Sequence, residues 1–243
     1  MTPAALLGLL RLASPALPVG GFSYSEALEA AVDCGLVHDE DSAARWLSDQ
    51  LHLAQARSDL PLVASAHAAW HSHDAVRIAQ LNAWLLTTRE SAELRAQTEQ
   101  MGRSMLDWLR QQSANGDARI ATLAALTPAP AWPIAFALGC VQAGADAHET
   151  VLACGFSWAE NQVQAALKAV PLGQRSGQRI LARLAQELEP LAQMALALGD
   201  EQRQAFAPLL AIGSSRHEPQ YSRLFRSWPQ RPFAPSNCRR CAW

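Results

Sequence analysis

The sequence predicts an all-α fold, a single-domain bundle of roughly ten helices, and three observations support it. Apolar residues recur at three- and four-residue spacing along most of the chain, which is the period of an amphipathic helix. Capping residues precede several of these segments, and no segment shows the strict alternation that is typical of a strand. Hydrophobic residues make up 49% of the 243 residues, which is enough to fill a sizeable core.

Helix boundaries in the first half are indicated by short local signals. Thr2, followed by proline, is typical of an N-cap and opens a helix to residue 13. Ser23 and Glu26 have the spacing of a capping box, which would start a helix that Gly35 closes. The other helices expected here span 39–56, 60–70, 76–86 and 89–111.

The second half follows Asn115-Gly116, a dipeptide typical of turns. The prolines of TPAPAWP, residues 127–133, predict a rigid connector that joins two halves of one domain. Pro171 ends a helix, because the residue before proline is pushed out of the helical region. From Gly213 the helical pattern fades. The helices expected in this half span 119–126, 134–143, 149–170, 173–197 (one helix bent at Pro190, or two) and 201–212.

Charge and cysteine content limit the possible partners and the compartment. The formal net charge is −2, so no basic field indicates nucleic acid. No stretch is long and apolar enough to cross a membrane, and no basic residues precede the first apolar run, so we expect neither an anchor nor a signal peptide. Cys34, Cys140 and Cys154 lie in apolar helical contexts and are expected to be buried free thiols. These features predict a cytoplasmic protein.

The segment PVGGFSYS, residues 18–25, resembles a phosphate-binding loop only in its glycines. A Walker-type loop needs a lysine that meets the phosphates, and a dinucleotide fingerprint needs a βαβ unit. Neither is present, so the segment is interpreted as a rigid turn that sets the angle between two helices. Glu26 and Glu29 lack a neighbour that would tune one of them for acid–base chemistry. The sequence therefore predicts no enzyme and no cofactor.

Two patterns could in principle hold a metal. His67 and His71 share a helix face, but a solvated helix end is the favoured interpretation. Cys238 and Cys241 form a CxxC without a second pair to complete a zinc site, so a loose tail is favoured. We therefore expect no metal site. A nickel store that uses these four residues is the alternative, and it predicts tight nickel binding by the protein alone.

The C-terminal segment IGSSRHEPQYSRLFRS, residues 212–227, is rich in arginine and aromatic residues. These residue types dominate interface hot spots, so the segment is interpreted as a docking surface rather than a frayed terminus. Four segments, taken together and in this order, resemble the urease accessory protein family UreF: LLRLASPALPVGGFSYSEALEAAV, RESAELRAQTEQMGRSM, GFSWAENQVQAALKAVPLGQ and SRHEPQYSRLFRS. The resemblance runs from residue 6 to residue 227. The organisation that it implies is a UreF-like helical domain at 1–227 and an unmatched extension at 228–243.

The resemblance implies an all-α homodimer without catalytic chemistry of its own. It also implies three partners: the accessory protein UreD (also called UreH), the nickel-carrying GTPase UreG and the apo-urease subunits. A departure from the family motif is Pro219, which stands where the family usually has threonine. The partner-binding residues implied by the motifs are Glu29, Lys168, Gln174, Arg216, His217, Tyr221, Arg223 and Phe225.

Two interpretations of the family function remain open at this stage. The first is a non-enzymatic scaffold that recruits the GTPase for nickel delivery. The alternative is a GTPase-activating protein that supplies an arginine finger from Arg216 or Arg223. A finger arginine would act on the partner's rate of GTP hydrolysis, whereas a scaffold arginine would act on assembly.

Overall fold

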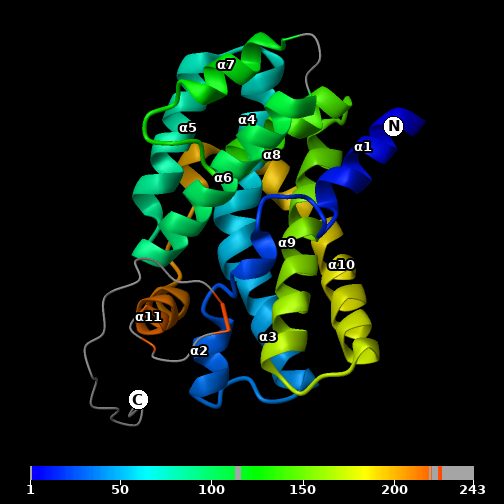
Figure 1. The fold of residues 1–243 in the computed structure, drawn as a ribbon, viewed down its shortest axis with the longest axis vertical. Coiled ribbons are helices and arrows are strands. Elements are labelled where there is room, and N and C mark those ends of the chain that lie inside the picture. The colour runs from blue at the N-terminus through cyan, green and yellow to red at the C-terminus, as the bar shows by residue number, and fades with distance from the viewer. Residues whose placement is uncertain (1, 113–115, 219, 221–223, 226–243) are drawn as a thin grey trace.

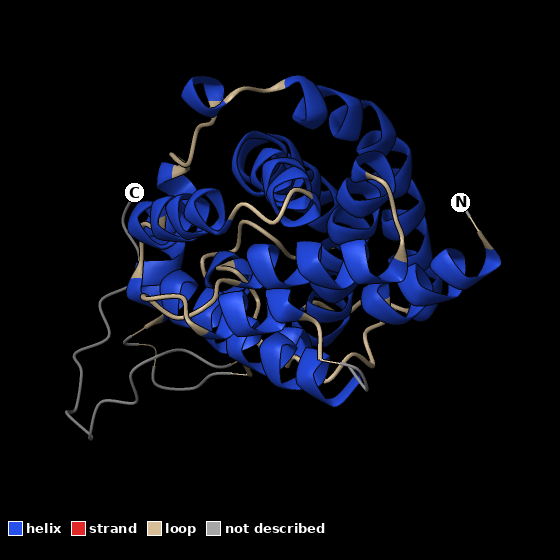
Figure 2. Ribbon diagram, turned by 90° about the horizontal axis from the view of Figure 1, so that it is seen from above, coloured by secondary structure: helices blue, strands red, loops and turns tan. Residues whose placement is uncertain are grey.

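The computed structural model describes residues 2–112, 116–218, 220 and 224–225. Within these ranges every regular element is a helix and no strand occurs (Figure 2), which confirms the all-α prediction. The elements in chain order are α1 (Pro3–Ala13), η1 (Gly21–Ser23), α2 (Leu28–Asp33), α3 (Glu40–Gln50), the π-helical η2 (Leu51–Asp59), α4 (Leu60–His71), α5 (Ala75–Thr88), α6 (Ala92–Gln112), α7 (Ala118–Ala124), α8 (Trp132–Ala143), α9 (Ala147–Ala169), α10 (Gln174–Ala197), η3 (Asp200–Gln202) and α11 (Pro208–His217).

Helices α4 and α8 form the centre of the bundle. Helix α4 packs against α5, α8, α9 and α10, and α9 runs beside α10 (Figure 1). Both central helices are apolar around most of their circumference, as burial on all sides requires. The Trp70 indole N–H of α4 donates a 2.9 Å hydrogen bond to the Ile134 carbonyl of α8. The two halves of the chain thus share one core, which confirms a single-domain bundle.

The connector between the halves is fixed by a buried amide on α5. The Asn82 side chain donates to the carbonyls of Pro128 and Ala129 at 3.0 and 3.2 Å, and its oxygen accepts the Ala131 N–H at 2.8 Å. Gly102 of α6 lies directly against the same segment, because a Cβ added there would sit 1.9 Å from the Pro130 carbonyl oxygen. The proline-rich connector is therefore a packed part of the core.

Most of the predicted helix ends are confirmed. Thr2 caps α1, since its hydroxyl accepts the Ala5 N–H at 3.1 Å. Gly35 follows α2 with a φ of +74°, the left-handed conformation that favours glycine after a helix. Helix α9 ends two residues before Pro171, and α10 continues through Pro190 as one helix. The turn predicted at 115–116 lies partly outside the described residues.

The predicted capping box of Ser23 and Glu26 is wrong. Glu26 and Ala27 have φ angles of +46° and +66°, so they cannot be the first turn of a right-handed helix, and α2 begins only at Leu28. The Ser23 backbone N–H donates instead to the Gly20 carbonyl at 3.0 Å within η1. The Glu26 side chain turns inward to partners on other helices, and these tertiary contacts override the local capping signal.

The helix predicted at 201–212 is displaced toward the C-terminus. A short 3₁₀ turn, η3, is followed by extended residues, and α11 starts at Pro208, whose fixed φ suits the first helical position. The helix then continues to His217, beyond the point where the sequence pattern fades. Polar residues of its last turn face inward, so a pattern of hydrophobic residues cannot predict that this turn is buried.

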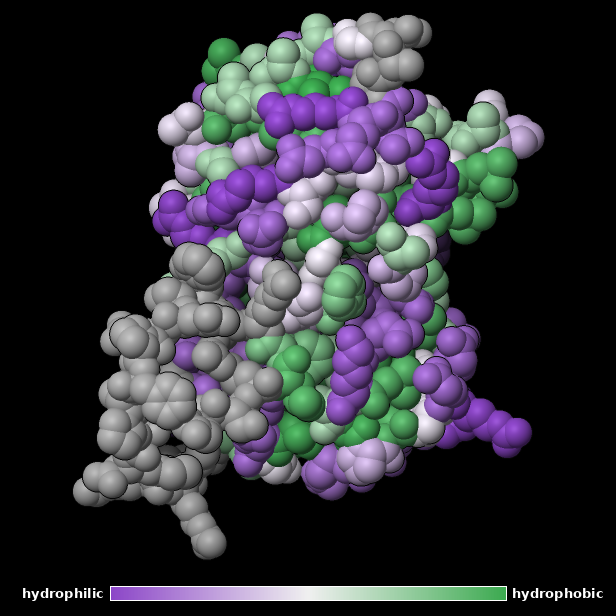
Figure 3. Space-filling view, viewed as in Figure 1, coloured by the Kyte–Doolittle hydropathy of each residue, from purple (hydrophilic) through white to green (hydrophobic). Residues whose placement is uncertain are grey.

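The surface is divided between polar and apolar regions (Figure 3). In this view hydrophilic residues cover the upper part over α6, and hydrophobic residues gather in the lower part and over α1. Leu6, Leu7 and Leu10 of α1 are between 42% and 63% exposed, so this helix has an apolar outer face. Among the described residues no helix is both long enough and apolar enough to span a bilayer.

Candidate functional site

Helix α11 is held by one face, and that face is largely polar. Leu210, Ser214 and His217 are its buried residues, and their spacing of four and three places them on one side. Gly213 lies between them and permits close approach, since a Cβ there would come within 3.0 Å of the Ala27 Cβ. The Ser214 hydroxyl lies 2.8 Å from the Ser91 hydroxyl before α6. These contacts dock α11 onto the region of α2 and α6.

His217 bridges two carboxylates at the centre of this interface. Its side chain is 0% exposed; Nδ1 lies 2.8 Å from Glu93 Oε2 and Nε2 lies 2.9 Å from Glu29 Oε2. Carboxylate oxygens accept hydrogen bonds, so both ring nitrogens donate, as in an imidazolium ion. Burial by itself lowers the pKa of His217, but the hydrogen bonds and charges of Glu93 and Glu29 outweigh it, and the pKa lies above its usual value.

Glu29 also holds the chain that follows α11. Its Oε1 accepts the Leu224 N–H at 2.7 Å and its Oε2 accepts the Phe225 N–H at 3.1 Å. Phe225 is only 6% exposed, and the Lys168 ammonium lies 5.8 Å from the centre of its ring. The same ammonium lies 5.6 Å from the Phe22 ring and donates to the Phe22 carbonyl at 3.4 Å. Residues far apart in the sequence thus converge at this end of the bundle.

The opposite face of α11 is exposed and mainly apolar. Leu209 and Ile212 are 46% and 45% exposed, and Arg216 completes this face one turn later. Leu224, at the point where Glu29 fixes the chain, is 70% exposed. This face thus places two exposed aliphatic side chains beside an arginine.

The residues predicted from sequence divide into three groups, apart from Arg216, which lies on the exposed face of α11. Glu29, Lys168, His217 and Phe225 come together in the arrangement above, with Glu29 and His217 buried rather than presented to solvent. Gln174 is the exposed first residue of α10, and no hydrogen bond or ion pair between described residues joins it to this group. Tyr221 and Arg223 lie outside the described residues, as do Pro219, the Cys238–Cys241 pair and the extension from 228. Partner binding by the predicted residues, and the boundary at 227, stay predictions.

Glu93 is the site residue that the sequence argument missed. Its side chain is 1% exposed at the start of α6. The sequence did contain a signal that Glu93 is buried. Glu93 lies on the same face of the helix as Gln97, Met101 and Met105, which all face the core. A carboxylate on such a face needs a buried partner, and that partner is His217.

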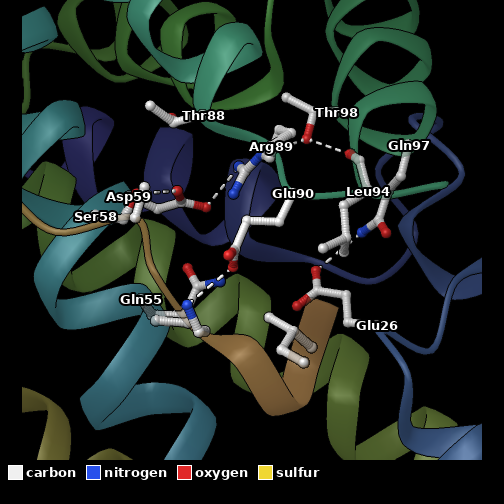
Figure 4. A pocket seen from close by; sticks show the side chains of 14 residues that line it. Glu26, Gln55, Ser58, Asp59, Thr88, Arg89, Glu90, Leu94, Gln97 and Thr98 are labelled. Carbon is white, nitrogen blue, oxygen red and sulfur yellow. Dashed lines mark hydrogen bonds and ion pairs between the residues drawn. The ribbon is translucent and has the colours of Figure 1, made fainter. Parts of the chain in front are cut away.

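A second polar cluster lies deeper in the bundle and surrounds two small adjoining cavities of about 50 and 40 Å³. Figure 4 shows the Gln97 amide pointing to Glu26 and the Arg89 guanidinium lying between Asp59 and Thr98. Gln97 donates to Glu26 Oε1 at 2.9 Å, and Arg89 donates to Asp59 Oδ2 at 2.8 Å. Both cavities touch these residues, so they form one polar interior region between α6 and η2.

Glu26 joins this interior region to the loop before α2. Its Oε2 accepts the Trp158 indole N–H of α9 at 2.8 Å. Burial raises the pKa of Glu26, and the hydrogen bond from Trp158 and the charge of Arg89 reduce that rise. The Gln97 side-chain oxygen is buried and has no hydrogen-bond partner among the described residues, and cavities of this size and polarity are suited to ordered water.

The described cysteines and His67 lie at buried or half-buried positions. Cys140 and Cys154 are buried free thiols, as expected, and burial raises the pKa of each; Cys34 is only half-buried. His67 was expected at a solvated helix end, but it is 7% exposed and its Nε2 donates to the Ala145 carbonyl at 2.9 Å. No cluster of three metal-ligating side chains occurs among the described residues.

Comparison with known proteins shows which family this chain is similar to. Residues 37–185 match the UreF family. A urease accessory protein UreF of Paracidovorax citrulli is 60% identical over 228 residues, covering 92% of this chain and 90% of that protein. One of Methylibium petroleiphilum is 58% identical, covering 92% and 94%, and one of Cupriavidus pinatubonensis is 48% identical, covering 93% and 100%. With an all-helical bundle and matches over most of both chains, this protein belongs to the UreF family.

Proposed function

We propose that this protein is a non-enzymatic scaffold for urease maturation that binds the accessory protein UreD (also called UreH) and recruits the GTPase UreG. The assembly would deliver nickel to apo-urease in the cytoplasm, with this protein as a homodimer. Its relatives are named as urease accessory proteins, which supports the general role. The observation that carries the scaffold proposal is the outer face of α11, where exposed Leu209, Ile212 and Arg216 lie on a helix fixed from behind.

The chemistry of the described residues agrees with a scaffold. The glycine loop at residues 18–25 folds into a turn and η1 and contains no lysine of its own. The nearby Lys168 ammonium is engaged with the Phe22 carbonyl and ring. A partner that carries its own phosphate loop would therefore supply the nucleotide. The low content of charged residues, 17% of the chain, also suits a surface that other proteins cover.

Ile212→Glu tests the docking face, with Leu53→Glu as the matched control. Ile212 and Leu53 are 45% and 49% exposed, so both changes place a carboxylate at a similarly accessible apolar position, but Leu53 lies in η2. We expect Ile212→Glu to abolish co-elution with purified UreD in size-exclusion chromatography and Leu53→Glu to leave it intact. Equal retention of UreD by both variants would overturn the docking face, and failure of the unmodified chain to bind UreD or UreG would overturn the scaffold.

Arg216→Ala separates the scaffold from the arginine-finger alternative. Loss of a finger would lower the GTP turnover of the partner by about a thousandfold or more, even when the complex is saturated. We expect instead weaker assembly with GTP turnover in the saturated complex changed by less than about tenfold. Arg223→Ala belongs in the same assay. A thousandfold loss of turnover in either variant would replace the scaffold with a GTPase-activating protein.

A further inference from the structure

The burial of His217 changes how this residue can serve partner binding. Its side chain is 0% exposed between α2, α6 and α11, so it cannot touch a partner while α11 stays docked. Any effect of His217 on assembly must therefore pass through residues that it positions. The contacts of its two ring nitrogens show which residues these are.

A continuous chain of hydrogen bonds runs from α6 to the segment after α11. Glu93 accepts a hydrogen bond from the Nδ1–H of His217, and this bond fixes the orientation of the ring, so that the Nε2–H points at Glu29. Glu29 in turn receives the backbone N–H groups of Leu224 and Phe225. Each bond in this chain involves an ionised group, and such bonds are stronger than those between neutral groups.

Charge balance explains why Glu93 matters to a segment that it does not touch. Glu29 is 5% exposed, and a buried carboxylate is costly without a nearby cation. A protonated His217 supplies that cation, and Glu93 helps to keep His217 protonated. Removing the charge of Glu93 would make protonation of His217 less favourable. Glu29 would then lose its neighbouring cation, and its hydrogen bonds to the Leu224 and Phe225 N–H groups would weaken.

The elements packed around this chain of bonds carry other charged groups as well. Glu218 accepts the Glu93 backbone N–H at 3.1 Å, and Gln220 donates to Asp33 of α2. Lys168 of α9 lies over the Phe225 ring, and Arg216 lies on the exposed side of α11. The described part of the segment after α11 is thus tied to α2 at two points. This arrangement turns Phe225 inward and leaves Leu224 70% exposed.

We propose that Glu93, His217 and Glu29 form an internal latch that holds the Leu224–Phe225 segment against α2, and that Glu93 is thereby a positioning residue for partner binding. This inference rests on the proposed function, because it assumes that the latched segment and the adjoining face of α11 meet the partner. The latch itself is a property of the free protein and can be measured without any partner.

Glu93→Gln in the full chain tests the latch, with Glu99→Gln as its matched control. Glu99 lies on the same helix, where its carboxylate pairs with Arg95 and Arg103 at the surface. Hydrogen exchange of the Leu224 and Phe225 amides is the direct measurement, with amides of α8 as the internal reference for global unfolding. We expect Glu93→Gln to speed exchange at 224–225 by about tenfold to a hundredfold relative to α8, as loss of a charge-assisted bond predicts, and Glu99→Gln to leave it unchanged.

A pH series separates a latch from a general loss of stability. Protection of 224–225, corrected for intrinsic exchange, should fall in the unmodified chain as the pH rises through the pKa of His217. In Glu93→Gln the same fall should occur at lower pH, because one of the groups that raise this pKa has lost its charge. If Glu93→Gln does not fold, His217→Gln serves instead. Its neutral amide can still donate to Glu29, but it does not titrate, so protection of 224–225 should show no fall with rising pH.

The partner assay distinguishes failure of the latch from failure of the proposed function. Faster exchange at 224–225 together with at least about tenfold weaker binding of purified UreD supports the whole inference. Unchanged exchange at 224–225 in Glu93→Gln, or exchange that rises equally in α8, overturns the latch. Faster exchange with unchanged UreD affinity leaves the latch standing and overturns the role of this segment in partner binding.

Discussion

At the scale of single residues, His217 makes the stability of the protein depend on pH. Its pKa is raised in the folded state, so its favourable interactions are fully present below the unfolded value of about 6.5 and are lost as the pH rises through the folded value. We expect the difference in unfolding free energy between the unmodified chain and His217→Gln to be largest near pH 6 and to shrink toward pH 9. Urea denaturation across this range measures it, and a constant difference would contradict the assignment.

Asn82 is a buried residue whose side chain satisfies backbone groups of the connector. It is 1% exposed and satisfies the carbonyls of Pro128 and Ala129 and the Ala131 N–H. Asn82→Ala would leave the buried Ala131 N–H and the two partly buried carbonyls without this partner, which we expect to lower the unfolding free energy by about 3 kcal/mol. Chemical denaturation measures the loss. Gln100→Ala removes an exposed amide and serves as the control, and equal effects of the two changes would show that the connector does not depend on Asn82.

Single residues also show where local signals fail. Ser23 and Glu26 have the spacing of a capping box, but Glu26 hydrogen-bonds Gln97 and Trp158 instead. The backbone at Glu26 takes a left-handed φ of +46° to make this possible. The spacing of a capping box indicates only which hydrogen bonds the local chain can form. The inward orientation of Glu26 depends instead on hydrogen-bond donors of α6 and α9. Sequence spacing could not reveal those donors.

At the scale of elements, the contact between α6 and the connector leaves no room for a side chain. A Cβ at Gly102 would lie 1.9 Å from the Pro130 carbonyl oxygen and 2.8 Å from the Ala131 carbonyl carbon. Backbone atoms cannot move aside as flexible side chains do, so Gly102→Ala should cost about 3 kcal/mol of unfolding free energy despite the higher helix propensity of alanine. Thermal and urea denaturation measure this cost. Gly199→Ala, where the nearest atom lies 3.6 Å away, should change stability little; a stable Gly102→Ala variant would refute the close contact.

Helix α11 shows why element boundaries were harder to predict than the presence of helices. Apolar periodicity placed a helix at 201–212, whereas α11 spans Pro208–His217. Its last turn is buried through a serine hydroxyl and an imidazole rather than through apolar residues. A hydrophobic pattern cannot detect such a turn, because the favourable burial of polar groups depends on partners that other elements supply.

At the scale of the whole molecule, the packing of α4 on α8 predicts cooperative unfolding. These helices belong to opposite sides of the connector at 127–133, yet they share one buried core. We expect urea unfolding followed by tryptophan fluorescence and by far-ultraviolet circular dichroism to give one coincident transition. Two separated transitions would show that the halves fold as independent units, contrary to a single-domain bundle.

The sequence by itself determined the helical class, most helix positions and the family. Capping residues, prolines and apolar periodicity act within one or two helical turns, so they can be read directly along the chain. Tertiary structure alone decided that Glu93 and Glu29 meet at His217, because these pairs are 124 and 188 positions apart. It also decided that three predicted partner-binding residues, Glu29, His217 and Phe225, are buried. The physical reason is that burial and charge pairing depend on which helices pack together, and local patterns do not specify that packing.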